Sequence, residues 1–117
     1  MKLVIDTRPD GIAVLGWTEP TVLDASNADE LRAQLRGVEQ RCARLVLDLS
    51  QVEFVDSAII GVLVGLLRRT RAAGGDVKLA ALHPDIETIF EVTRLHRVFR
   101  IHPSVAAALQ EFQSAAP

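Results

Sequence analysis

Apolar and polar positions follow two different periods along the chain. Five short apolar runs predict β-strands, at residues 3–5, 12–15, 45–49, 77–81 and 98–101. Arg8-Pro9-Asp10-Gly11 separates the first two runs and is typical of a turn, so these strands are expected to form an antiparallel hairpin. Residues 45–49 are nearly all apolar, as expected of a strand buried on both faces. Residues 51–55 are interpreted as a short link.

Four other segments have apolar residues at helical spacing. They are a segment at about residues 27–40, one that opens at Asp56-Ser57 and stops at Gly74-Gly75, a short one after His83, and one after Pro103. Ser26, with Asp29 three residues later, resembles a capping box and predicts the N-cap of the first helix. Gly74-Gly75 favours the end of the second.

After the hairpin, strands and helices alternate, which favours parallel strands joined by right-handed crossovers. The sequence therefore predicts an α/β fold: a small, open, four- to five-stranded, mostly parallel sheet with an N-terminal antiparallel hairpin and about four helices. The 117 residues suit a single domain, here residues 1–112, followed by a flexible tail at residues 113–117.

Composition narrows the classes of function. Aromatic residues make up only 4% of the chain, so the core must be aliphatic, and the net charge of −2 disfavours nucleic-acid binding, which needs a basic face. A single cysteine, Cys42, excludes an internal disulfide framework, and a buried or inert thiol is expected. The N-terminus lacks the features of a signal peptide, and the apolar stretch 58–67 is too short to span a bilayer. A small cytoplasmic protein without membrane insertion is expected.

Asp56-Ser57, at the start of a deeply apolar helix, is the most informative pair in the chain. One interpretation is structural: Asp56 or Ser57 caps the helix and satisfies a free backbone N–H group. The other is functional: Ser57 is exposed at the positive end of the helix dipole and can be phosphorylated. A phosphate beside Asp56 would sharply increase the local negative charge and repel a partner that packs against neutral serine.

Enzyme chemistry is disfavoured. No Gly-x-Ser-x-Gly motif surrounds Ser57, and the spacing of His83, His96 and His102 ties none of them to it. The histidine spacings match no familiar metal site, and no glycine-rich segment ends in the Gly-Lys-Ser/Thr of a phosphate-binding loop. We expect no catalytic residues, no metal and no cofactor, and the histidines are interpreted as solvated loop or helix-end residues.

Two further features have two interpretations each. Arg68, Arg69 and Arg71 fit either a solvated helix end or contact with an acidic partner. Trp17, close to Pro20 and Val22, is either part of an exposed apolar patch or an anchor in the core.

Several motifs in order resemble a known family. The central one is Leu45-Val46-Leu47-Asp48-Leu49, then Val52-x-Phe54-Val55-Asp56-Ser57, then Gly61 and Leu63. The flanking ones are Leu23-Asp24-Ala25-Ser26-Asn27-Ala28-x-x-Leu31, Ala73-Gly74-Gly75-x-Val77-x-Leu79 and Ile89-Phe90-x-x-Thr93-x-Leu95-x-x-Val98-Phe99. Together they resemble the STAS domain, and more narrowly the bacterial anti-sigma factor antagonists, over essentially the whole chain.

The resemblance implies a non-catalytic binding module. In such proteins the serine after the aspartate is phosphorylated by the anti-sigma factor, a serine kinase with a histidine-kinase-like ATPase fold. The unphosphorylated form binds that kinase and frees a sigma factor, and a metal-dependent serine phosphatase removes the phosphate. Carried over by position, Ser57 is the phosphorylation site, and the partner-binding residues are Asp24, Asp56, Ser57, Ala58 and Ile59.

This chain departs from the family pattern at two of those positions. The family usually has Ser or Thr and then Gly after the phosphorylated serine, where this chain has Ala58 and Ile59. The bulk of Ile59 motivates an alternative function, a constitutive STAS subunit of an ABC-type lipid transporter or of another signalling complex. A weak homodimer is a further open alternative.

Overall fold

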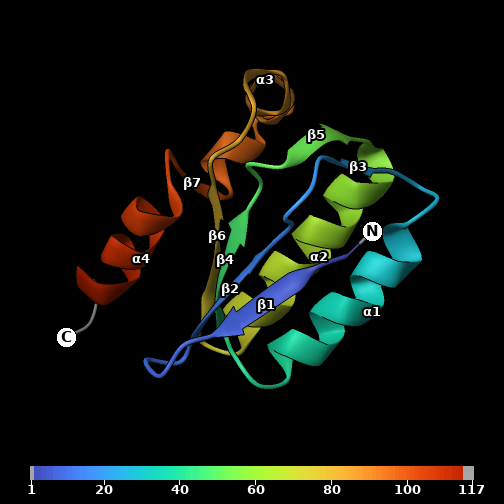
Figure 1. The fold of residues 1–117 in the computed structure, drawn as a ribbon. Helices are drawn as coiled ribbons and strands as arrows, with labels where there is room; N and C mark the ends of the chain where they lie inside the picture. Colours follow the sequence, from blue (N-terminus) through green and yellow to red (C-terminus); the bar gives the residue numbers. More distant parts are fainter. Residues whose placement is uncertain (1, 115–117) are drawn as a thin grey trace.

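A computed structural model describes residues 2–114 (Figure 1). Its strands are β1 (Val4–Thr7), β2 (Ile12–Gly16), β3 (Thr21–Leu23), β4 (Arg44–Asp48), β5 (Val52–Val55), β6 (Asp76–Ala80) and β7 (Arg100–His102). Its helices are α1 (Ala28–Glu39), α2 (Ser57–Ala72), α3 (Pro84–Val92), the short 3₁₀ turn η1 (Leu95–Arg97) and α4 (Val105–Ser114).

The main sheet has five strands in the order β1-β2-β4-β6-β7. β1 runs antiparallel to β2, and every other neighbouring pair is parallel. The predicted α/β fold, with its N-terminal antiparallel pair and four helices, is confirmed. Nearly continuous apolar sequence places β4 at the centre, where Leu45, Val46 and Leu47 are all buried.

Helices cover the two faces of this sheet unequally. Figure 1 shows α1 and α2 side by side on one face and α4 alone on the other. The large core lies between the sheet and α1 and α2, with Leu31, Leu35, Leu63 and Leu66 fully buried there. A second, smaller cluster lies under α4 and consists of Ile12, Val46, Ala80, Ala108 and Phe112. The larger core therefore fixes α2, whose first residue is Ser57.

The interpretation of residues 51–55 as a link is wrong, because Val52–Val55 form β5. β5 pairs in parallel with β3, and the two make a separate small sheet. Val52 and Val55 are buried, whereas Glu53 and Phe54 between them are exposed. This arrangement lacks the strict alternation that reveals a half-buried strand in a sequence.

Two predicted boundaries near the C-terminus are also wrong. The strand expected at residues 98–101 is β7, which begins only at Arg100. Phe99 precedes it and is buried against Phe90, with the ring centroids 5.7 Å apart in an edge-to-face arrangement. The helix α4 continues through Ser114, beyond the predicted start of a tail at residue 113, and residues 115–117 of that predicted tail lie outside the described residues.

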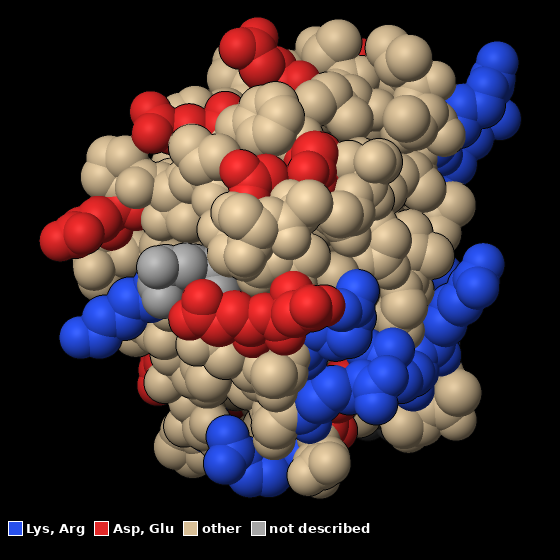
Figure 2. All heavy atoms as spheres, turned by 90° about the vertical axis from the view of Figure 1, so that its right-hand side faces the viewer, with Lys and Arg blue, Asp and Glu red and all other residues tan. Residues whose placement is uncertain are grey.

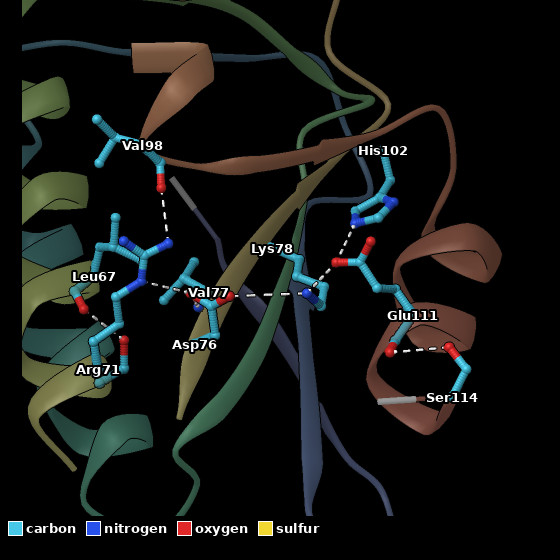
Figure 3. Close-up of polar contacts among 10 residues, drawn as sticks. Leu67, Arg71, Asp76, Val77, Lys78, Val98, His102, Glu111 and Ser114 are labelled. Carbon is cyan, nitrogen blue, oxygen red and sulfur yellow. Dashed lines mark hydrogen bonds and ion pairs between the residues drawn. The ribbon is translucent and has the colours of Figure 1, made fainter. Parts of the chain in front are cut away.

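An ionic cluster attaches α4 to the sheet (Figure 3). The Lys78 side chain, on β6, is buried, and its Nζ lies 2.5 Å from Oε1 of Glu111 and 4.4 Å from the centroid of the Phe112 ring. His102 Nε2 lies 3.4 Å from the same Glu111 oxygen. The hydrogen bond from Lys78 holds the pKa of Glu111 below its usual value of 4.5. The ionised carboxylate is thus the form that the folded protein prefers.

The turn between α2 and β6 requires glycine at two consecutive positions. Gly74 has φ +85°, a left-handed conformation that side chains disfavour. A Cβ atom at Gly75 would lie 1.8 Å from the backbone oxygen of Ala43, the residue before β4. This close approach lets the ends of β4 and β6 lie side by side.

We predict that Gly75→Ala lowers the free energy of unfolding by about 1–3 kcal/mol, since the backbone at Ala43 must move to admit a methyl group. Gly37→Ala is the matched control. Gly37 lies within α1 with no atom close to its Cβ position, so alanine should stabilise the protein by about 0.5–1 kcal/mol. Urea unfolding measures both, and equal effects of the two substitutions would contradict the close approach.

We predict that Glu111→Gln destabilises the protein at neutral pH and that this difference disappears in acid. The folded pKa of Glu111 is depressed, so its contribution is present above the unfolded pKa, near 4.5, and is lost as the pH falls through the folded pKa. Urea midpoints of the wild type and the variant, measured from neutral pH down to below pH 4.5, test this. A difference that stays constant with pH would show that the carboxylate charge is unimportant.

Candidate functional site

Asp56 lies between β5 and α2 and caps the helix. Its backbone is extended, with φ −112° and ψ −177°, and its Oδ1 accepts a hydrogen bond of 3.1 Å from the Ile59 N–H group. This satisfies one of the free N–H groups in the first turn. The structural interpretation of Asp56 as a helix cap is therefore confirmed.

The same carboxylate also holds a distant segment. Its Oδ2 accepts a hydrogen bond of 2.9 Å from the N–H group of Ala25, in the loop between β3 and α1. The two residues are 31 positions apart in the sequence. Asp56 therefore fixes the start of α2 against the loop that leads into α1.

That loop is ordered by its own side chains. Asp24 Oδ1 accepts hydrogen bonds from the Ser26 hydroxyl and from the Ser26 N–H group, the latter at 2.9 Å. The hydroxyl bond is the main cause that lowers the pKa of Asp24 below its usual 3.8. Asn27 accepts from the Asp24 N–H group and donates to the Val22 oxygen, both at 2.9 Å. These bonds fix the shape of the loop.

The prediction that Ser26 caps the first helix is wrong. The helix α1 begins at Ala28, its N-cap residue is Asn27, and no side chain makes a capping bond there. The Ser26 hydroxyl bonds back to Asp24 instead, and Asn27 turns its side chain toward β3. Serine competes for local backbone and side-chain partners in this way when a loop offers them.

Ser57 is the first residue of α2 and is exposed. Within the described residues 2–114, its hydroxyl makes no hydrogen bond. The N-terminus of a helix carries partial positive charge and free N–H groups, which tolerate a phosphate. Ser57 therefore presents an exposed hydroxyl at the N-terminus of a helix.

The two residues after Ser57 differ in exposure. Ala58 is half-buried, whereas the Ile59 side chain is fully buried in the large core. The expectation that Ile59 contacts a partner is therefore wrong for its side chain, because the sheet-facing side of α2 holds it inside. The bulk of this residue, which departs from the family pattern, fills the core instead of the surface.

An exposed apolar pair lies beside these residues. Val22 and Phe54 are opposite each other in the β3–β5 pair, and each is 48% exposed. Val22 precedes Asp24 by two positions, and Phe54 precedes Asp56 by two. We call Val22, Asp24, Phe54, Asp56 and Ser57 the Ser57 surface. The sequence alone did not single out Phe54, because residues 51–55 were interpreted as a link and not as a strand that exposes this side chain.

The charged residues are unevenly distributed over the molecule. Figure 2 shows Lys and Arg side chains gathered over the lower and right-hand parts of the face that carries α1, while Asp and Glu lie mainly above them. The view is turned about the vertical axis, so the upper end is the one where α2 begins in Figure 1. The carboxylate of Asp56, the N-cap residue directly before Ser57, lies at this end of α2.

Two of the three arginines at the end of α2 have structural partners. Arg69 makes two hydrogen bonds with the Glu39 carboxylate, of 2.8 and 3.0 Å, and so joins α2 to α1. Arg71 bonds to Asp76 and to the Val98 oxygen (Figure 3). Arg68 is exposed. Arg69 therefore has a structural role between two helices, whereas Arg68 and Arg71 remain exposed at the end of α2.

The tryptophan, cysteine and histidine residues considered in the sequence lie away from the Ser57 surface or make contacts within the fold. Trp17 is only 7% exposed, so of its two interpretations the structure supports the anchor in the core. Cys42 is buried, as predicted. His83 Nε2 lies 2.9 Å from the Ser50 oxygen, and His96 Nδ1 lies 3.3 Å from the Phe90 oxygen. In residues 2–114, no three His, Cys, Asp or Glu side chains are grouped as metal ligands. No helix within that range is long and apolar enough to cross a membrane.

Comparison with known sequences identifies relatives of the whole chain. A family model described as the STAS domain matches residues 5–108. The protein BtrV of Bordetella bronchiseptica is 30% identical over 118 residues, which cover 100% of this chain and 99% of BtrV. The anti-sigma-B factor antagonist of Bacillus subtilis is 28% identical over 88 residues, which cover 75% of this chain and 81% of that protein.

Solved structures share the fold. A crystal structure of the protein TM1081 of Thermotoga maritima has a TM-score of 0.82 at 23% identity, covering 93% of this chain and 92% of that one. The Bacillus cell fate determinant SpoIIAA in its phosphorylated form has a TM-score of 0.73 at 16% identity, covering 95% and 99%. At these identities the likeness concerns the fold alone.

We predict that Asp56→Ala lowers the free energy of unfolding by about 1–3 kcal/mol, because it removes both the helix cap and the bond to Ala25. Hydrogen exchange at the Ala25 amide should accelerate as well. Ser57→Ala is the control and should change stability by no more than about 0.5 kcal/mol. Equal stability of the two variants, with an unchanged Ala25 amide, would contradict the linking role of Asp56.

Proposed function

The chain belongs to the STAS domain family, among its anti-sigma factor antagonists, and we propose that it is a phosphorylation-controlled binding module for an anti-sigma serine kinase. Members of this family are binding modules without catalytic activity, so the prediction that the protein is not an enzyme is confirmed. In the proposed scheme, unphosphorylated protein binds the kinase, and the sigma factor that the kinase held becomes free for transcription.

One observation carries the proposal: Ser57 is exposed at the first position of α2, and the residues around it are already ordered. A kinase needs an accessible hydroxyl, and Ser57 offers one without breaking an internal hydrogen bond. The motif that ends in Asp56-Ser57 resembles the family's phosphorylation motif at the same position. The solved phosphorylated and unphosphorylated forms of SpoIIAA support a phosphate-dependent role for this fold.

Binding before phosphorylation would use the whole Ser57 surface. Val22 and Phe54 provide apolar side chains for the kinase to cover, and Asp24 and Asp56 provide charges that set its orientation. Ala58, half-buried beside Ser57, would lie at the margin of the contact. A surface this small and pre-ordered needs little rearrangement on binding, which favours affinity.

Phosphorylation would end the complex through charge. A phosphate adds about −1.5 to −2 at neutral pH. The whole chain has a net charge of −2, so one modification nearly doubles it and places the increase beside Asp56. A serine phosphatase that removes the phosphate would restore binding. Because the kinase requires ATP, we assign the cycle to the cytoplasm.

We predict that Ser57→Asp weakens binding to the purified cognate anti-sigma kinase by at least about tenfold, whereas Ser57→Ala retains it. Ser114→Asp is the matched control, because it adds the same charge to an exposed serine at the end of α4 and should leave affinity unchanged. Titration calorimetry with the isolated kinase measures all three variants.

Equal affinity of Ser57→Ala and Ser57→Asp would contradict control by charge. The wild-type protein should also gain one phosphate, on Ser57, when it is incubated with the kinase and ATP. Stable co-purification with a membrane transporter ATPase, regardless of the residue at position 57, would favour the constitutive transporter subunit instead.

A further inference from the structure

β1 forms one edge of the main sheet, and its outer side is open. All four residues of β1 are exposed, and within the described residues the strand pairs only with β2. Val4 and Ile5 are among the exposed large apolar residues, at 43% and 37%. An edge strand with unpaired N–H and C=O groups is a template for another strand.

The hydrogen bonds of the hairpin decide which groups point outward. The Arg8 N–H group donates to the Ile12 oxygen at 2.9 Å, so Arg8 bonds toward β2. Bonding alternates along an antiparallel pair. Val4 and Asp6 therefore also direct their backbone groups toward β2, whereas Leu3, Ile5 and Thr7 direct theirs away from the sheet.

The edge sequence Lys2-Leu3-Val4-Ile5-Asp6 is complementary to itself when it is read in the opposite direction. It has a positive residue at one end, a negative residue at the other and three apolar residues between them. Lys2 and Asp6 are both exposed, and neither has an ion-pair partner within the described part of the chain. Native edge strands often carry charges that repel other copies, but these two charges attract.

We propose that two copies of this chain pair antiparallel through β1, with Val4 at the two-fold axis, and so join their sheets into one. In this register Lys2 of one copy lies opposite Asp6 of the other, and Leu3 lies opposite Ile5. The outward-facing groups of Leu3 and Ile5 then exchange backbone hydrogen bonds. Val4–Val4 and Lys2–Asp6 become the non-bonded pairs, in which side chains lie closest.

Backbone geometry restricts the alternatives. A register shifted by one residue would bring inward-facing backbone groups opposite outward-facing ones, so no ladder could form. A shift by two would place Ile5 on the axis and Asp6 opposite Val4, which leaves both charges without partners. The proposed register is the one that satisfies the backbone, the apolar residues and the charges together.

The other edge of the sheet does not fit this role. β7 is only three residues long and carries Arg100 and His102. Two antiparallel copies of β7 centred on Ile101 would place Arg100 of one copy opposite His102 of the other, both of them basic residues. The β7 edge therefore lacks the charge complementarity that the β1 edge has.

A register-specific cross-link tests the proposal. Val4→Cys places two thiols opposite each other in a non-bonded pair, where Cα atoms lie about 4.5 Å apart and a disulfide can form. Asp6→Cys is the control, because its thiol would face Lys2 of the second copy. The native Cys42 is buried and should not react. Under mild oxidation, only Val4→Cys should become a covalent dimer on a non-reducing gel. Equal cross-linking of the two variants, or of neither, would overturn the register.

Charge exchange gives a second, independent test. Asp6→Lys should weaken dimerisation by about tenfold, because it places like charges opposite each other at both ends of the interface. The double variant Lys2→Asp, Asp6→Lys exchanges the charges and should restore the dimer. Sedimentation velocity over a wide range of concentration measures all three proteins. A wild type that stays monomeric throughout, or a double variant as weak as Asp6→Lys, would overturn the proposal.

Discussion

The Ser57 surface depends on the two hydrogen bonds that the Asp56 carboxylate accepts. One oxygen caps α2 through the Ile59 N–H group, and the other binds the Ala25 N–H group in the loop before α1. Each oxygen accepts one of these bonds, so the start of α2 and that loop are held as one unit. Hydrogen bonds to a charged acceptor are stronger than neutral ones, which suits a single residue that joins two segments.

This arrangement explains how a domain without an active site could be controlled by one modification. The main core fixes α2, with Ile59 fully buried directly behind Ser57. Asp24 and Asn27 fix the neighbouring loop through bonds of their own. A phosphate would then change the charge of a surface whose backbone is already set. The ionic cluster of Lys78, Glu111 and His102 has a different role, since it attaches α4 to the opposite face of the sheet.

Much of this fold can be predicted from the sequence, because long apolar runs bounded by polar residues or glycine form the central strands and α2. Residues 45–49 and the stretch after Asp56 could hardly be placed elsewhere than in the core. β3 and β5 could not be predicted in the same way. They are short, they pair outside the main sheet, and β5 exposes two successive residues, so no alternating pattern marks it.

Contacts in the site between residues close in sequence could be predicted. Contacts between residues far apart in sequence could not. Asp56 as a cap follows from its position before an apolar helix. Its bond to Ala25 does not, because no local pattern reports a contact across 31 residues. The prediction for Ser26 was wrong for a related reason. A serine near the start of a helix can either cap the helix or bond within the preceding loop, and here its hydroxyl bonds to Asp24 in the loop.

The most direct test of the account is the chemical state of Ser57 in the cell of origin. The protein should be purified from its own cells, and mass spectrometry should determine both its phosphorylation and the proteins that come with it. We expect a phosphate on Ser57 in part of the population, and a serine kinase bound only to the unphosphorylated part. An unmodified Ser57 under all growth conditions, or a kinase bound equally to both forms, would contradict the account.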